Sequence, residues 1–167
     1  MANEVTLTGY EMAMASDAGR LRNIAAIKEG RKPQIDGGEW QAHIEGAAGE
    51  VAAAKLLNVF WGGSINTFKA GGDIDGTGWE VRTRSKHFND LIVKESDPDG
   101  RVMILVTGKS PHFMVRGWIR SEEAKKAEFK QNYGGHGNAY FVPQSKLHLM
   151  AVSYTHLRAH ETREDLV

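Results

Sequence analysis

The sequence predicts an α+β fold in which a central mixed, mostly antiparallel sheet is flanked by helices. Two long helical patterns come first, at residues 8–30 and 40–58. Short β-type runs follow, separated by turn signals such as the Asp-Pro-Asp-Gly sequence at 97–100. No internal repeat or linker divides residues 1–150, so we expect a single domain there.

The first helix is expected to begin at Thr8, which can form a capping box with Glu11. Gly30 is its expected end. Between them an apolar stripe recurs at helical spacing, made of Tyr10, Met14, Leu21, Ile24 and Ile27.

The later part of the chain reads mostly as strands. They are expected at residues 64–69, 73–75, 79–85, 90–94, 101–107, 113–120 and 140–142. Ser121 is expected to cap a charged helix that runs to about Gln131.

Composition excludes several classes of protein. The chain has no cysteine, so neither a disulfide nor a thiolate metal site can form. No apolar run approaches the roughly 18 residues of a membrane span, and we expect no membrane partner. Basic and acidic residues balance at 21 each, so global charge gives no support to nucleic-acid binding.

Residues 151–167 are expected to be a non-native tail. Residues 152–162 resemble one translated frame of a transposon-end adaptor used in sequencing libraries, which indicates a metagenomic source. Such a segment carries no fold or function argument. His156 and His160 are therefore set aside, although they are spaced like metal ligands on a helix.

An acidic motif stands at the centre of the chain. The sequence GGDIDG at residues 71–76 is followed by WEVRTR at 79–84. Side chains alternate along a strand, so Glu80 and Arg82 share one face. A turn over residues 75–78 would place Ile74 opposite Trp79 and Asp73 opposite Glu80. Two carboxylates about 5 Å apart at Cβ repel each other unless a cation lies between them, which predicts a hard-metal site.

Glu50 is a second acidic candidate, on the predicted helix at 40–58. It shares its helix face with small or apolar residues: Ala47, Ala53, Ala54 and Leu57. A carboxylate there is costly unless it is paired or bound to metal, and Arg82 or Arg84 is the alternative partner. Gly46 and Gly49 each cost about 1 kcal/mol relative to Ala, which indicates a close approach to the helix backbone.

These motifs together resemble the PD-(D/E)XK nuclease superfamily, in particular the branch that includes Holliday-junction resolvases. That family carries an Asp and then Glu-x-Lys on neighbouring strands, with a Glu after Gly on the preceding helix. This chain reads Glu80-Val81-Arg82 and Gly49-Glu50 at the matching positions. The resemblance spans roughly residues 40–120 and implies a restriction-endonuclease-like fold and a metal-dependent DNA endonuclease.

The resemblance also implies roles for individual residues. The implied catalytic residues are Glu50, Asp73, Glu80 and Arg82. The implied ligands of Mg²⁺ or Mn²⁺ are Glu50, Asp73, Asp75, Glu80 and the carbonyl of Val81. Pairing with Glu80 favours Asp73 as the aspartate, while the Ile-Asp wording of the related nucleases favours Asp75. Arg82 departs from the usual Lys; it can orient a phosphate but cannot act as a base.

DNA is the expected partner. Arg84, Lys86, His87 and Arg116 are expected to contact its backbone. The resemblance also allows a homodimer, and it fits a phage protein in the cytoplasm of a bacterial or phage-infected cell. One alternative is a catalytically inactive nuclease-fold protein that binds DNA or acts in assembly. Another is an ordinary surface ion network in a protein of unrelated role.

Overall fold

The computed structural model describes residues 3–31, 38–65, 72–74, 77–132, 134 and 137–150. Asp75, most of the strand expected at 64–69 and the tail at 151–167 lie outside the described residues. In the part of the chain that is described, no helix is long and apolar enough to cross a membrane.

The strands form two sheets. The first has the order β1-β5-β4-β2 and the second the order β3-β7-β6. Their bounds are β1 Glu4–Thr6, β2 Trp79–Arg84, β3 Leu91–Lys94, β4 Val102–Lys109, β5 His112–Arg120, β6 Lys130–Asn132 and β7 Asn138–Val142. Only the β2–β4 pair is parallel among these strands. The expected α+β fold with a mixed, mostly antiparallel sheet is confirmed, but the expectation of one central sheet is wrong.

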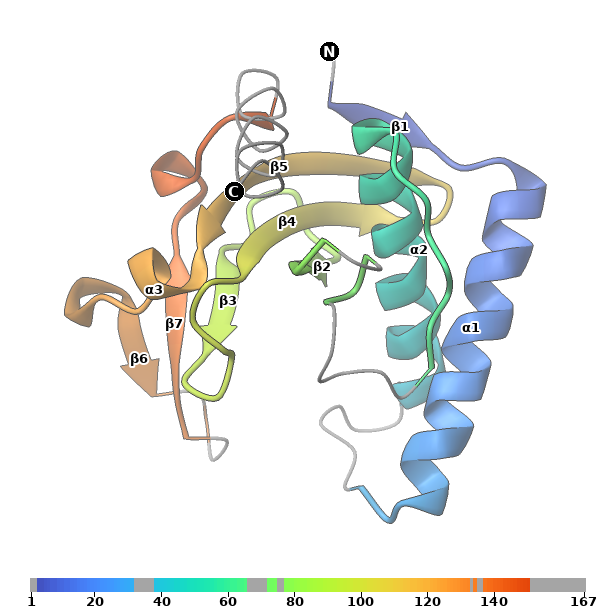
Figure 1. The fold of residues 1–167 in the computed structure, drawn as a ribbon, viewed down its shortest axis with the longest axis horizontal. Coiled ribbons are helices and arrows are strands. Elements are labelled where there is room, and N and C mark those ends of the chain that lie inside the picture. The colour runs from blue at the N-terminus through green and yellow to red at the C-terminus, as the bar shows by residue number, and fades with distance from the viewer. Residues whose placement is uncertain are drawn as a thin grey trace, which may run out of the picture.

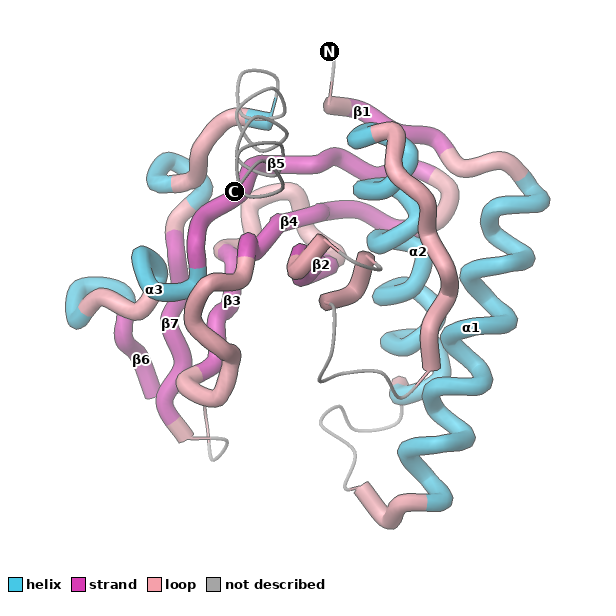
Figure 2. The backbone as a smooth tube through the Cα atoms, in the orientation of Figure 1, coloured by secondary structure: helices cyan, strands magenta, loops and turns pink. Residues whose placement is uncertain are grey.

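The first sheet lies between two layers. Helix α2 (Glu39–Leu57) packs on one face, and α1 (Gly9–Lys28) packs on the outer side of α2. Strands β3, β7 and β6 gather on the other side of the molecule (Figures 1 and 2). Strand β4 contributes to both cores, because Ile104 and Val106 belong to the helix-side cluster while Met103 and Leu105 belong to the cluster with the second sheet. Burial on both faces explains why this strand reads as a continuous apolar run.

The expected start and end of α1 are confirmed. The Thr8 hydroxyl accepts from the Glu11 amide at 3.2 Å, and the Thr8 amide donates to the Glu11 carboxylate at 2.8 Å. After the last turn Gly30 has φ +66°, and the amide of Arg31 donates to the carbonyl of Ala26 at 3.0 Å. This six-to-one bond around a left-handed glycine is a Schellman motif, which ends the helix.

The apolar stripe of α1 faces solvent. Tyr10 is 77% exposed and Ile27 is 60% exposed. The helix packs on α2 through small residues instead, and a Cβ on Gly19 would lie only 2.5 Å from the Cα of Ile44. Because the two helix backbones approach this closely, large side chains are excluded from the contact and lie on the opposite face of α1.

Helix α2 lies equally close to β2. A Cβ at Gly49 would lie 1.9 Å from the Thr83 hydroxyl oxygen, so the close approach predicted for Gly49 is confirmed. The same expectation for Gly46 is wrong, since a Cβ there would meet open space. The contact at Gly49 sets Glu50, the next residue, beside β2.

The expectation of a long charged helix after Ser121 is wrong. Helix α3 covers only Ser121–Ala124, and a 3₁₀ turn at Ala127–Phe129 then leads into β6. Ser121 does not cap the helix, because its hydroxyl donates to the Pro98 carbonyl at 2.8 Å and accepts from the Arg101 amide at 3.2 Å. Phe129 is buried in the core beside the second sheet, which draws the chain away from a helical path.

Candidate active site at the edge of β2

Asp73 lies on the outer edge of β2. Ile74 pairs antiparallel with Trp79, and the Asp73 amide donates to the Trp79 carbonyl at 2.8 Å. The register predicted for this turn is therefore confirmed. The Asp73 carboxylate turns back to the strand and accepts from the Val81 amide at 2.7 Å. This bond holds the carboxylate next to Glu80.

Glu80 is largely enclosed, with 13% of its side chain exposed. Burial and then the negative charge of Asp73 raise the pKa of Glu80 to about 7, against the opposing charges of Arg82 and Arg101. A side-chain hydrogen bond between Glu80 and Asp73 acts in the same direction. A carboxyl that is crowded by a second acid keeps its proton to a higher pH when no cation offsets the negative charge.

Glu50 is buried in a bidentate ion pair. Its two oxygens accept from Nη1 and Nη2 of Arg22 at 2.8 and 2.9 Å, and the indole Nε1 of Trp61 donates at 3.0 Å. Burial, with a further contribution from Asp73, raises the pKa of Glu50 to about 7, although the Arg22 contacts oppose this. The expected alternative partners, Arg82 and Arg84, are wrong: the partner is Arg22.

The negative charge of Asp73 raises the pKa of both Glu50 and Glu80, so it acts on both acids. The structure brings together the three acids predicted from the sequence. Glu50 is buried, and Glu80 is largely enclosed with 13% of its side chain exposed.

The fit of a metal ion to these residues is partial. Among the described residues, no three His, Cys, Asp or Glu side chains are placed to hold an ion together, and Asp75 is not described. Both oxygens of Glu50 are already engaged. Asp73 and Glu80 remain as side-chain donors for an ion. The Val81 carbonyl is a third donor, because a strand residue directs its N–H and C=O to the same side and the Val81 amide faces Asp73. These are hard oxygen donors of the kind that Mg²⁺ and Mn²⁺ prefer.

Arg82 shares the face of Glu80, as expected from strand alternation. It pairs with Asp97 at 2.7 Å and lies 3.9 Å from the Glu80 carboxylate. Burial opposes its charge, but Asp97 and the other nearby acids raise the pKa of Arg82 above its ordinary value. Arg82 is therefore a fixed positive charge, held at the acidic edge by the turn that follows β3.

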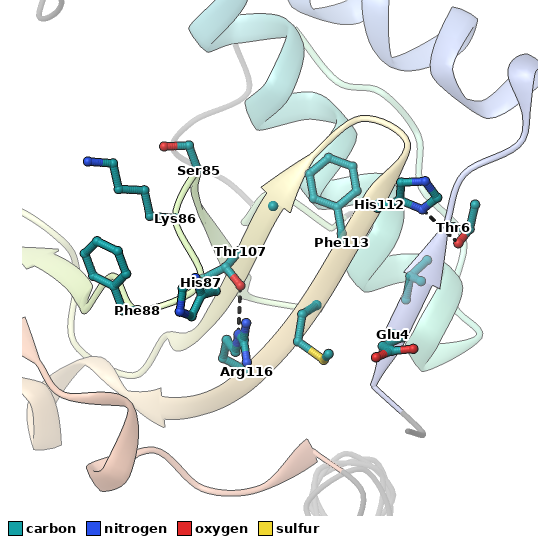
Figure 3. A pocket seen from close by; sticks show the side chains of 13 residues that line it. Glu4, Thr6, Ser85, Lys86, His87, Phe88, Thr107, His112, Phe113 and Arg116 are labelled. Atoms are coloured by element: carbon teal, nitrogen blue, oxygen red, sulfur yellow. Dashed lines mark hydrogen bonds between the residues drawn. The ribbon is translucent and has the colours of Figure 1, made fainter.

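The four residues expected to contact DNA separate into two groups. Arg84 donates to the Asp90 carbonyl at 2.9 Å and supports the turn after β2. Lys86 and His87 are exposed on that turn, and together with Arg116 of β5 they line a pocket of about 640 Å³ (Figure 3). The structure therefore places Lys86, His87 and Arg116 together, without Arg84.

Three partners in this region were missed by reasoning from the sequence: Arg22, Trp61 and Asp97. Arg22 had a usable signal, since it follows Ala15 by seven residues and Ala18 by four, and so shares the buried face of α1. Trp61 and Asp97 lie in connecting segments, where no periodicity indicates direction.

No protein-family model, curated protein or solved structure matches this chain. The geometry of the site is therefore what indicates its chemistry.

Proposed function

We propose that this protein is a metal-dependent DNA endonuclease that hydrolyses phosphodiester bonds, on a scaffold of the PD-(D/E)XK type. The observation that carries the proposal is the Asp73–Glu80 carboxylate pair, which the Val81 amide holds at the open edge of β2 beside the cationic Arg82. Like charges are kept adjacent here at a cost in stability, which is typical of a site arranged for a cation.

Mg²⁺ or Mn²⁺ would be held by Asp73, Glu80 and the Val81 carbonyl. When bound, such an ion lowers the pKa of a coordinated water and offsets the charge of the scissile phosphate. Glu50 is a positioning residue in this proposal: its contacts with Arg22 anchor its carboxyl group and join α1 to the edge of the site.

Arg82 would hold the phosphate. Its guanidinium stays protonated, so it supplies charge and hydrogen bonds but takes no proton from water. Asp97 fixes one side of the guanidinium at 2.7 Å and orients the cation along the strand face shared with Glu80. An oriented charge of this kind stabilises developing negative charge without having to reorganise during the reaction.

A second candidate function is a nuclease-fold protein that binds DNA without cleaving it. Two observations favour it: Arg22 occupies both oxygens of Glu50, and Asp97 and Glu80 both engage Arg82. The two functions differ in ion binding, because an inactive site should show no stabilisation by Mg²⁺ or Mn²⁺ in a thermal melt.

Cleavage of a panel of labelled DNAs tests the proposal. Duplex, flap, junction and single-stranded substrates are incubated with the full chain and Mn²⁺ or Mg²⁺, beside the Glu80→Gln variant. Glu128→Gln serves as the matched control, because Glu128 is exposed in the 3₁₀ turn away from the site. The proposal expects cleavage by the parent and the control only. Equal cleavage by Glu80→Gln would exclude this assignment of the site.

A further inference from the structure

A pocket lies on the face of the first sheet that points away from the helices. Its floor includes Thr107 of β4 and Arg116 of β5, whose neighbours Val106 and Val115 face the helix-side core. The turn at residues 85–88 forms one wall, and β1 lies at the opposite wall (Figure 3). The volume of about 640 Å³ is within the range of pockets that hold small organic ligands.

Two cations reach this pocket without a carboxylate partner in the described part of the chain. Arg116 uses its Nε–H on the Thr107 hydroxyl at 2.7 Å, which fixes the plane of the guanidinium (Figure 3). The ammonium of Lys86 lies 5.8 Å from the centre of the Phe88 ring. Both groups suit a phosphate: Arg116 as an oriented fork of donors and Lys86 as a mobile point charge.

Phe88 supplies the aromatic surface. It is 63% exposed at the end of the turn, although a large apolar side chain gains little from that position in the free protein. His87 packs against it edge to face, with ring centres 5.2 Å apart, which holds the Phe88 ring in place and leaves the ring accessible. A braced, exposed ring beside cations is the arrangement on which unpaired bases stack.

We propose that this pocket binds a segment of single-stranded DNA, with one backbone phosphate at Arg116, another at Lys86, and a base stacked on Phe88. The assignment rests on the proposed function for its choice of DNA as the ligand. Bases within a duplex are already stacked, so a ring such as Phe88 favours substrates that carry an unpaired strand.

The pocket and the acidic edge share one strand. Glu80 and Arg82 lie on the face of β2 away from the helices, because Trp79 and Val81 belong to the helix-side core. Strand β2 carries Glu80 and ends at Arg84, four residues or about 13 Å further on, and the turn with Lys86 follows directly. A single DNA strand held at Lys86 can therefore run along β2 towards the acidic edge. The expected substrate is DNA with a single-stranded segment next to the cleaved bond.

Binding without cleavage isolates the pocket. A labelled oligothymidylate of about twelve nucleotides, within the site sizes of single-strand binding domains, is titrated by fluorescence anisotropy in EDTA. Phe88→Ala is expected to weaken binding about tenfold, for one lost stacking contact, and Phe88→Tyr to retain it. Arg116→Ala should lower the slope of log K against log salt by about 0.7. Phe60→Ala is the control, because Phe60 is 81% exposed outside the pocket.

The outcomes separate this inference from the nuclease proposal. Weak binding by Phe88→Ala, normal binding by Phe60→Ala and weaker binding of the matched duplex support the pocket, even if no DNA is cleaved with Mn²⁺. Equal affinity for single strand and duplex, or no effect of Phe88→Ala, overturns the pocket assignment, even if the protein cleaves DNA.

A different observation concerns the outer face of α1. Residues 10, 14, 17, 21, 24 and 28 follow each other at alternating steps of four and three, the spacing of a coiled-coil seam. Tyr10, Met14, Leu21 and Ile24 occupy four of these positions, and all four are exposed. Two exposed apolar pairs on one face of a helix, here separated by Asp17, are typical of an interaction surface.

We infer that this seam pairs antiparallel with α1 of a second copy. The six positions are symmetric about residue 19, so a two-fold axis there places Met14 against Ile24 and Tyr10 against Lys28 of the other helix. Asp17 and Arg20 pair with each other within the helix. The same axis brings this pair beside its copy, so that acidic and basic groups alternate across the seam. The pattern of apolar and charged positions is therefore complementary to itself, as a two-fold interface requires.

Light scattering during gel filtration tests this pairing. The parent is expected to elute as a dimer, and Leu21→Glu as a folded monomer with an unchanged circular dichroism spectrum. Phe60→Glu, a charge at an exposed aromatic off the seam, should leave the dimer intact. Asp17→Arg should weaken the dimer and the added Arg20→Asp should restore it. A parent that is monomeric at sub-millimolar concentration, or a dimer unaffected by Leu21→Glu, overturns the inference.

Discussion

The two ends of β2 differ in charge and in what holds the charges. At its first residues, Asp73 and Glu80 lie together in a half-enclosed edge, and burial with mutual repulsion raises the pKa of Glu80. Beyond its last residue, Lys86 and Arg116 line an open pocket and have no acidic partner in the described part of the chain. A chain with balanced total charge can therefore hold two segregated sites, and net charge alone would have hidden both.

The largest expected effect is on catalysis at the acidic end. Asp73→Asn and Glu80→Gln are each expected to reduce single-turnover cleavage by about 10³-fold, because each replaces a negatively charged metal ligand by a neutral amide, a change of several kcal/mol. Both variants should melt at or above the parent temperature, since each removes repulsion between two partly buried acids. Matched loss of activity and of melting temperature would instead indicate unfolding.

The next largest effect is a difference in the free energy of unfolding lost by substitutions at the acidic end and at the open end of β2. Arg22→Met leaves Glu50 buried without its partner and is expected to lower the free energy of unfolding by about 3–5 kcal/mol. Adding Glu50→Gln should recover part of this loss. Arg116→Met, at the open end, is expected to cost less than about 1 kcal/mol. Urea denaturation of the four proteins measures the difference, and equal losses at both ends would contradict the comparison.

The acidic end should also make stability depend on pH. The pKa values of Glu50 and Glu80 rise from 4.5 to about 7 on folding, so the folded protein holds more protons than the unfolded chain between these values. The free energy of unfolding is therefore expected to fall as pH rises from 4.5 to 7, by at most a few kcal/mol. Thermal melts in EDTA measure this fall, Glu80→Gln should reduce it, and Glu128→Gln should leave it unchanged.

The smallest effect is expected at the open end. Lys86→Ala should leave the melting temperature within about a degree of the parent, because the side chain is exposed. Its removal should lower the slope of log K against log salt for DNA binding by the amount expected for about one lost phosphate contact. At saturating DNA the cleavage rate should be unchanged. A large fall in that rate would mean that Lys86 reaches the reacting phosphate, and that the two ends act as one site.

The sequence was most informative where one local pattern left a single arrangement. The turn after Asp73, the face shared by Glu80 and Arg82, and the capping box at Thr8 all depend on neighbours within a few residues. The side of α1 that packs could not be read from its large apolar residues, because Gly19 brings two backbones together and excludes them. The partners Arg22 and Asp97 depend on how distant elements are placed, which periodicity does not specify.

The central claim is that the Asp73–Glu80 pair is a site for a divalent ion, and calorimetric titration of Mn²⁺ tests it most directly. At a pH below the raised pKa of Glu80, about 7, binding should release protons, seen as a dependence of the heat on the ionisation enthalpy of the buffer. We predict binding with proton release in the parent and in Glu128→Gln, and loss of both in Glu80→Gln and Asp73→Asn. Absence of Mn²⁺ binding by the parent, or binding that both variants retain, would contradict the account.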